Sequence, residues 1–182
     1  TFEKCKESID GNILLSCRLG LADKEVRRSK ETRDDSRAGR GPGPGLSLEE
    51  GLLTAERLEK EGADLLNISH AHGIYRSAKP EDSRFSPVLH LAAAAKKRLS
   101  IPVIGIGDIL VPEDAEKVLG DSMADLIAVG RSMLADPAWA RKTVEGRADE
   151  INRCERCEPC HWFKDPSRCP TRKRFGPEPP TA

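Results

Sequence analysis

Four short and almost continuously apolar runs, each followed by a segment of helical periodicity, constrain this chain more than any other feature. The runs are residues 12–18, 64–69, 102–106 and 125–129. Runs this short and this apolar are typical of strands that are buried on both faces, as in parallel sheets. Because strand and helix alternate strictly, the pattern predicts right-handed βαβ units and an α/β fold.

The segments between the strands carry recognisable signals for the start of a helix. Ser47 and Glu50 form a capping box, Pro87 follows Ser86, and Pro112 precedes two acidic residues. Apolar residues at roughly helical spacing follow the first two signals. The residues that we expect to face the core are Leu52, Leu53, Ala55, Leu58 and Ala63, and then Leu89, Leu91, Ala92, Ala95 and Leu99.

Length and charge limit the function classes that remain. The 182 residues fall short of the roughly 250 that a complete (β/α)₈ barrel takes. Thirty cationic and thirty anionic side chains balance, so we expect neither nucleic acid nor a membrane as a partner. No apolar run approaches the ~20 residues that span a bilayer. The chain starts at Thr1 rather than Met, which leaves room for a processed or truncated start.

The third and fourth strands both end in a glycine followed by a charged residue, Gly107-Asp108 and Gly130-Arg131. In barrels, ligands bind at the carboxyl ends of the strands, and the loops after the last two strands often hold a phosphate. Glycine lets backbone amides approach an anion, and arginine adds a planar donor fork. The pair predicts a phosphate site. Each glycine alone would indicate only a tight turn. Arg18, at the end of the first strand, should project at the same face.

Four of the six cysteines gather near the C-terminus, at Cys154, Cys157, Cys160 and Cys169. Three thiols separated from one another by two residues, with a fourth that precedes a proline, are typical of iron–sulfur ligation. A structural zinc site, with His161 completing the set, is the alternative, and a segment without metal is a third. Clustered thiols favour a reducing compartment, so we expect the cytoplasm.

Several segments together resemble the old yellow enzyme family. They are Ser16-Cys17-Arg18-Leu19, residues 45–50, 62–69, 101–107 and 124–131, and Leu134-Ala135-Asp136-Pro137, in the family's order and spacing. The resemblance implies the C-terminal half of a (β/α)₈ TIM barrel, made of four parallel βα units. It implies FMN as cofactor, with Arg18 against the flavin ring and Gly107, Gly130 and Arg131 at its phosphate. Asp108 stands where the family has a second glycine.

The resemblance also implies an activity: flavin-mediated hydride transfer from NAD(P)H to the activated C=C bond of a small molecule, such as an enal or enoyl thioester. Longer members carry a [4Fe–4S] cluster after the barrel, followed by an FAD domain. The family's substrate-binding polar pair and its proton-donating tyrosine lie in the N-terminal half. Tyr75 does not match that tyrosine, so we name no catalytic acid in this chain.

The expected organisation has three parts: an FMN-binding half barrel over residues 1–150, a four-cysteine metal segment over 151–174, and a disordered tail over 175–182. Residues 23–45 read as a mobile loop, longer than the family's usual one. A half barrel needs the missing N-terminal half, or self-association, to cover its two open edges. The competing interpretations are a non-catalytic, zinc-stabilised binding module with a vestigial phosphate site and another phosphate-binding barrel enzyme.

Overall fold

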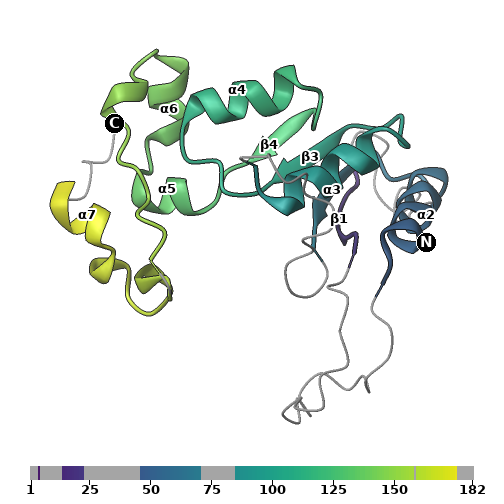
Figure 1. Ribbon diagram of the computed structural model, residues 1–182, viewed down its shortest axis with the longest axis horizontal. Helices are drawn as coiled ribbons and strands as arrows, with labels where there is room; N and C mark the ends of the chain where they lie inside the picture. The colour runs from purple at the N-terminus through teal and green to yellow at the C-terminus, as the bar shows by residue number, and fades with distance from the viewer. Residues whose placement is uncertain (1–3, 5–13, 23–45, 71–84, 158, 176–182) are drawn as a thin grey trace, which may run out of the picture.

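In the computed structural model, the described residues are 4, 14–22, 46–70, 85–157 and 159–175. Four parallel strands form one sheet in the order β1-β2-β3-β4, which confirms the predicted α/β fold of four parallel units (Figure 1). The predicted loop over 23–45 and residues 176–182 of the predicted tail lie outside the described residues. The strands are β1 (Ser16–Gly20), β2 (Leu65–Ser69), β3 (Val103–Ile106) and β4 (Leu126–Ala128).

The helices begin where the start signals predict. Ser47 Oγ accepts from the Glu50 amide at 3.3 Å, and a Glu50 carboxylate oxygen accepts from the Ser47 amide at 2.9 Å, so the capping box is complete. The α-helices are α2 (Leu48–Lys60), α3 (Pro87–Lys96), α4 (Pro112–Gly120), α5 (Arg131–Ala135), α6 (Trp139–Val144) and α7 (Pro170–Phe175), and the 3₁₀ turns are η1 (Ala148–Glu150), η2 (His161–Phe163) and η3 (Pro166–Arg168).

Two buried apolar clusters form the core, one around β1, β2 and α2, the other around α4 and the residues after β4. The predicted α3 stripe is confirmed, with Leu89, Leu91, Ala92 and Ala95 fully buried and Leu99 packed against the core. The prediction for Leu53 is wrong, because this side chain is 52% exposed. Helix α2 instead turns Gly51 toward the sheet. A Cβ there would lie 1.6 Å from the Leu21 carbonyl oxygen, so only glycine permits this approach.

An aspartate recurs just before β2 and before β4, and each one joins its strand to the preceding segment. Asp64 Oδ2 accepts from the Leu15 amide at 2.8 Å, and the Asp64 amide donates to the Leu15 carbonyl at 2.9 Å. Asp125 Oδ2 accepts from the Val103 amide at 3.0 Å, and its own amide donates to the Val103 carbonyl at 2.9 Å. The Lys96 side chain also pairs with Asp125, and this hydrogen bond is the main reason why the pKa of Asp125 is lowered.

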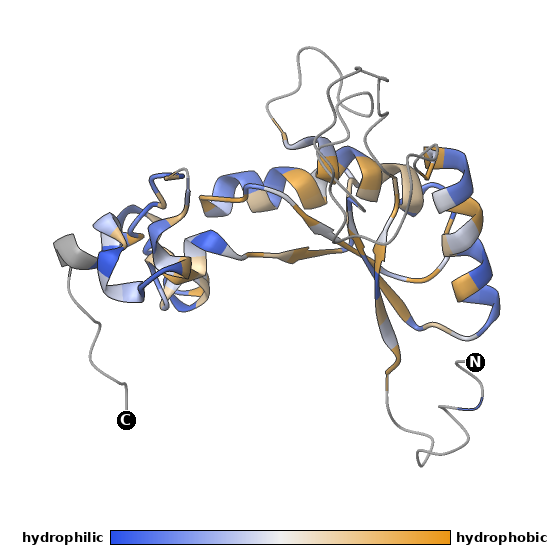
Figure 2. Ribbon diagram, turned by 90° about the horizontal axis from the view of Figure 1, so that it is seen from below, coloured by the Kyte–Doolittle hydropathy of each residue, from blue (hydrophilic) through white to orange (hydrophobic). Residues whose placement is uncertain are grey.

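Helices α2, α3 and α4 lie on one side of the sheet, whereas the helices after β4 lie beyond it (Figures 1 and 2). The opposite face carries the row Arg18, Asn67, Ile104 and Leu126. Leu126 is 47% exposed on this face, and Asn67 Oδ1 is buried without a hydrogen-bond partner. Within the described part of the chain, this face therefore has an exposed apolar side chain and a buried polar atom without a partner.

The residues after β4 form a lobe at one end of the molecule, where α5, α6 and α7 lie away from α2 (Figure 1). Helix α7 ends at Phe175, the first residue of the expected tail. None of the helices in the described ranges is both long and apolar enough to cross a membrane.

Candidate phosphate pocket and cysteine segment

All five residues predicted to bind the cofactor line one pocket. It has a volume of about 330 Å³ and lies where β2, β3 and β4 end, with Arg18 of β1 beside it. This is the carboxyl edge of the parallel sheet, where barrel enzymes bind their ligands. The pocket is lined by Arg18, Ser69, His70, Val88, Ile106, Gly107, Asp108, Ile109, Leu110, Ala128, Gly130 and Arg131.

Gly107 occupies a position that other residues could not take. Its φ of 150° is rare for residues with a side chain, and a Cβ there would lie 2.8 Å from Ser86 Cβ. The next residue, Asp108, has a φ of 51°, in the left-handed region that aspartate tolerates better than most residues. At Gly107 the turn after β3 therefore brings backbone to the wall of the pocket, and Asp108 adds its carboxylate there.

Gly130 and Arg131 form the opposite wall, after β4. A Cβ built on Gly130 meets nothing within 4 Å, so there is open space beside this backbone. The Arg131 guanidinium pairs with the Asp108 carboxylate across the pocket. Both side chains remain 38% exposed. A pair at a solvent-accessible rim is weak and can be displaced by a ligand.

Arg18 reaches the pocket from the first strand. Its Nη2 donates to Ser69 Oγ at 3.1 Å, at the end of β2. The side chain is exposed, and this partner is a hydroxyl rather than a carboxylate. Among the described residues, no carboxylate pairs with this guanidinium, so its positive charge is available on the ligand side of the sheet.

The four predicted metal ligands are free thiols and all are half-buried. Within the described ranges, however, no three Cys, His, Asp or Glu side chains converge closely enough to hold a metal ion. The arrangement therefore does not fit a cluster as it stands, although the thiols supply the right donor chemistry. One local feature suits a thiolate: the Arg156 amide donates to Cys154 Sγ at 3.4 Å, with Arg156 in the left-handed region at a φ of 54°.

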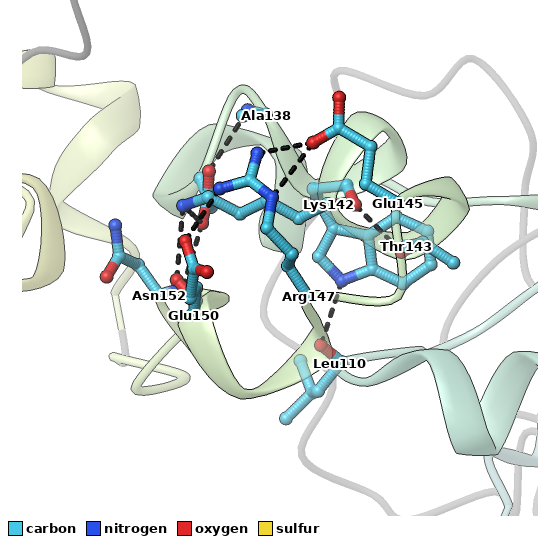
Figure 3. A network of polar contacts seen from close by, with 10 residues as sticks. Leu110, Ala138, Lys142, Thr143, Glu145, Arg147, Glu150 and Asn152 are labelled. Atoms are coloured by element: carbon cyan, nitrogen blue, oxygen red, sulfur yellow. Dashed lines mark hydrogen bonds and ion pairs between the residues drawn. The ribbon is translucent and has the colours of Figure 1, made fainter.

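A buried ion pair in the half barrel, which the sequence patterns did not single out, anchors the start of the cysteine segment. Lys142 Nζ lies 2.8 Å from Asp136 Oδ2, with both side chains buried. The Asp136 carboxylate also accepts from the Ala138 amide at 3.0 Å and from the Asn152 amide at 2.8 Å. Lys142 donates further to the Glu150 carbonyl at 3.1 Å. Figure 3 shows this network, with Asn152 two residues before Cys154.

Two more hydrogen bonds extend this network to the phosphate pocket. Trp139 Nε1 donates to the Leu110 carbonyl at 3.1 Å (Figure 3), and the buried Ser132 hydroxyl donates to the Ile109 carbonyl at 2.6 Å. Burial by itself raises the pKa of Asp136, but the hydrogen bonds from Lys142, Asn152 and Ala138 outweigh this and lower it. The only sequence signal for the network was Leu134-Ala135-Asp136-Pro137, which the family comparison had matched without assigning it a role.

The side chains that could act on a substrate are sparse in the described part of the chain. His70 is exposed and lines the pocket. Tyr75, which we did not match to a catalytic tyrosine, lies outside the described residues. The pocket can therefore bind and orient an anionic ligand, and among its described lining residues His70 is of the type most often used for proton transfer.

Comparisons with known proteins match most of the half barrel. The model of the NADH:flavin oxidoreductase / NADH oxidase family matches residues 44–150, more than half of the chain. The chain is 44% identical over 117 residues to an NADH oxidase of Thermoanaerobacter brockii, covering 62% of this chain and 18% of that protein. It is 31% identical over 122 residues to a bilirubin reductase of Mediterraneibacter gnavus, covering 65% of this chain and 19% of that protein. The chain thus spans about a fifth of the length of these relatives.

Solved structures share the fold at low sequence identity. The 6-hydroxypseudooxynicotine amine oxidase of Pseudomonas geniculata N1 superimposes with a TM-score of 0.62 at 21% identity, over 99% of this chain and 26% of that one. A 2-naphthoyl-CoA reductase superimposes with a TM-score of 0.61 at 22% identity, over 84% of this chain and 21% of that one. By its sequence match over residues 44–150, this chain belongs to the NADH:flavin oxidoreductase / NADH oxidase family.

Proposed function

We propose that this chain supplies the cofactor-phosphate half of an FMN-dependent NAD(P)H oxidoreductase. The observation that carries the proposal is that Arg18, Gly107, Asp108, Gly130 and Arg131, far apart in the sequence, line one pocket at the carboxyl edge of the sheet. The choice of flavin as the ligand rests on family membership, because the same pocket in another barrel could hold any phosphorylated metabolite.

The residues around the pocket suit the phosphate of FMN. The backbone at Gly107 and Gly130 can approach an anion closely, and Arg131 would donate to it through a planar fork. Arg18 would place a permanent positive charge beside the flavin ring. FMN, when bound, supplies the hydride-transfer chemistry, while the protein positions it and tunes its electronics.

For the reaction, we propose that NAD(P)H is the reductant and that the acceptor is a small molecule with an activated C=C bond. The T. brockii relative is named an NADH oxidase and the M. gnavus relative a bilirubin reductase, which supports reduction at the expense of NADH. The open sheet face fits a protein that needs further parts. We propose that an N-terminal half barrel, or a second copy of the chain, covers this face and its edges. Clustered free thiols favour the cytoplasm.

We further propose that Cys154, Cys157, Cys160 and Cys169 ligate a [4Fe–4S] cluster, and that an FAD domain could exchange electrons with it in a longer protein. The supporting observations are four thiols outside any disulfide and a backbone amide directed at Cys154 Sγ. Because the described thiols do not converge, metal binding would have to rearrange this segment.

A comparison of FMN with riboflavin tests the phosphate site, since the two differ only in the phosphate. We expect the full chain to bind FMN at least tenfold more tightly than riboflavin, measured by equilibrium dialysis. Arg131→Met should remove most of that preference, because a charge-assisted hydrogen bond contributes about 1.5–3 kcal/mol. Lys117→Met is the matched control, since its exposed ion pair with Asp121 lies on α4, outside the pocket.

Equal affinities of the wild-type chain for FMN and riboflavin would contradict the phosphate assignment. Metal analysis of the same preparation separates the enzyme from its competitor. Bound FMN with iron and sulfide supports the proposal, whereas zinc alone without flavin supports a non-catalytic, metal-stabilised binding module.

A further inference from the structure

Asp108 is an unexpected residue in a pocket assigned to an anion. Its carboxylate lines the pocket and pairs with Arg131, the cation that we assign to the phosphate. Its backbone is in the left-handed region, directly after Gly107, where glycine would serve at least as well. The backbone therefore does not require an acid at this position, so the property of Asp108 that matters for the pocket is its negative charge.

The charge of Asp108 gives Arg131 an internal partner. The carboxylate neutralises the guanidinium and holds it toward the turn after β3. An incoming phosphate needs the same donor fork, and two anions so close together repel each other. The ligand therefore has to displace the carboxylate from Arg131. Because both side chains are 38% exposed, water can solvate the carboxylate as it leaves.

A second guanidinium lies next to Asp108. Arg156, between Cys154 and Cys157, extends from the cysteine segment so that its Nη2 lies 3.5 Å from the Asp108 carbonyl oxygen. Its own amide is the one that donates to Cys154 Sγ. A cation on this side of the turn can receive the carboxylate that phosphate displaces. Arg156 would thereby connect the state of the pocket to the backbone between two of the cysteines.

We propose that Asp108 is a built-in anion that holds Arg131 and moves to Arg156 when a ligand phosphate takes its place. The inference rests on the proposed FMN phosphate site and gives Asp108 and Arg156 roles as positioning residues that set its affinity. It predicts that this pocket binds phosphate less tightly than the same pocket without the acid would.

The test measures FMN and riboflavin affinities of the full chain and three variants by equilibrium dialysis. Asp108→Asn keeps the shape and tolerates the left-handed backbone, so FMN should bind about three- to tenfold more tightly while riboflavin binding stays unchanged. Arg156→Gln should weaken FMN binding about threefold, because the displaced carboxylate loses its second partner. In the double variant the Arg156 effect should disappear. Arg153→Gln, a neighbouring exposed arginine, is the matched control.

The outcomes separate the two proposals. If wild-type protein prefers FMN but Asp108→Asn leaves that preference unchanged or reduces it, the inference about Asp108 is overturned and the phosphate site stands. If Arg156→Gln weakens FMN binding equally in the wild-type and Asp108→Asn backgrounds, the exchange between the two arginines is overturned. If wild-type protein has no preference for FMN, the phosphate site itself is wrong, and this inference fails with it.

Discussion

The half barrel and the cysteine segment are held together by different means. In the half barrel, residues 16–150, two apolar clusters are buried between the sheet and its helices. In the cysteine segment, residues 151–174, Ile151 and Thr171 are the buried residues among those described. Ile151 belongs to the second apolar cluster, and the Thr171 hydroxyl donates to the Arg153 carbonyl at 3.2 Å. The segment's described secondary structure consists of the 3₁₀ turns η2 and η3 and the short helix α7.

This difference shows where a core can supply stability and where it cannot. Buried apolar area is the main source of folding free energy, and the half barrel has it. A segment of about twenty residues without such a core usually depends on disulfides or metal. For this segment, the proposed metal ligands offer one source of stability, and the hydrogen bond from the Asn152 amide to Asp136 offers a second.

Metal removal should have the largest effect. For the chain reconstituted anaerobically with iron and sulfide, we expect chelation to abolish amide hydrogen-exchange protection across residues 153–172. The reason is that metal binding would supply the free energy that folds this segment. Protection of β3 and α3 should be unchanged. Cys157→Ser should mimic chelation, and Cys17→Ser, a half-buried thiol in β1, is the control. Equal protection with and without metal would show that the segment folds on its own.

Removal of the charge on Lys142 should have the next largest effect. Lys142→Met leaves the buried Asp136 carboxylate without its cation, and such a loss costs about 3–5 kcal/mol of unfolding free energy. Guanidinium denaturation measures it. Lys117→Met breaks an exposed pair, 50% and 47% accessible, and should cost less than about 1 kcal/mol. Similar losses in both variants would mean that the buried pair is not what joins the two regions.

The same contrast explains what could be predicted from the sequence. Apolar periodicity and helix start signals are local, so they located all four strands and the starts of α2, α3 and α4. The positions of Gly107 and Gly130 followed from topology, since parallel strands end at one edge. Leu53 was misplaced because the close approach of Gly51 to Leu21 sets the rotation of α2, and that contact joins residues far apart in the sequence.

The polar contacts were beyond sequence reasoning for a related reason. No periodicity marks Asp136 as the partner of Lys142 and Asn152, and none marks Asp108 as the partner of Arg131. Each pair depends on how loops lie after the sheet has formed. Cysteine spacing suggests a metal, but it does not show whether the thiols converge before the metal binds.

Acid should weaken the attachment of the cysteine segment by a smaller amount. Because the folded pKa of Asp136 lies below its unfolded value, its contribution is fully present above pH 5 and is lost as the pH falls through the folded pKa. By pH 3 the loss from this group is up to about 1.3 kcal/mol, given an unfolded pKa of about 3.9. The difference in unfolding free energy between wild type and Asp136→Asn should therefore shrink from pH 6 to pH 3. A constant difference would contradict the ionised carboxylate.

The smallest effect should come from the far end of the half barrel, at the capping box of α2. Ser47→Ala removes the acceptor for the Glu50 amide and should cost about 1 kcal/mol, whereas Ser47→Thr keeps the hydroxyl, which also donates to the Glu50 carboxylate, and should cost little. Hydrogen exchange should show the loss in α2. Protection of residues 153–172 in the metal-loaded chain should not change, because that segment is held through Asp136. If Ser47→Ala also lowered protection there, the two regions would unfold as one unit, and the conclusion that they have separate sources of stability would be wrong.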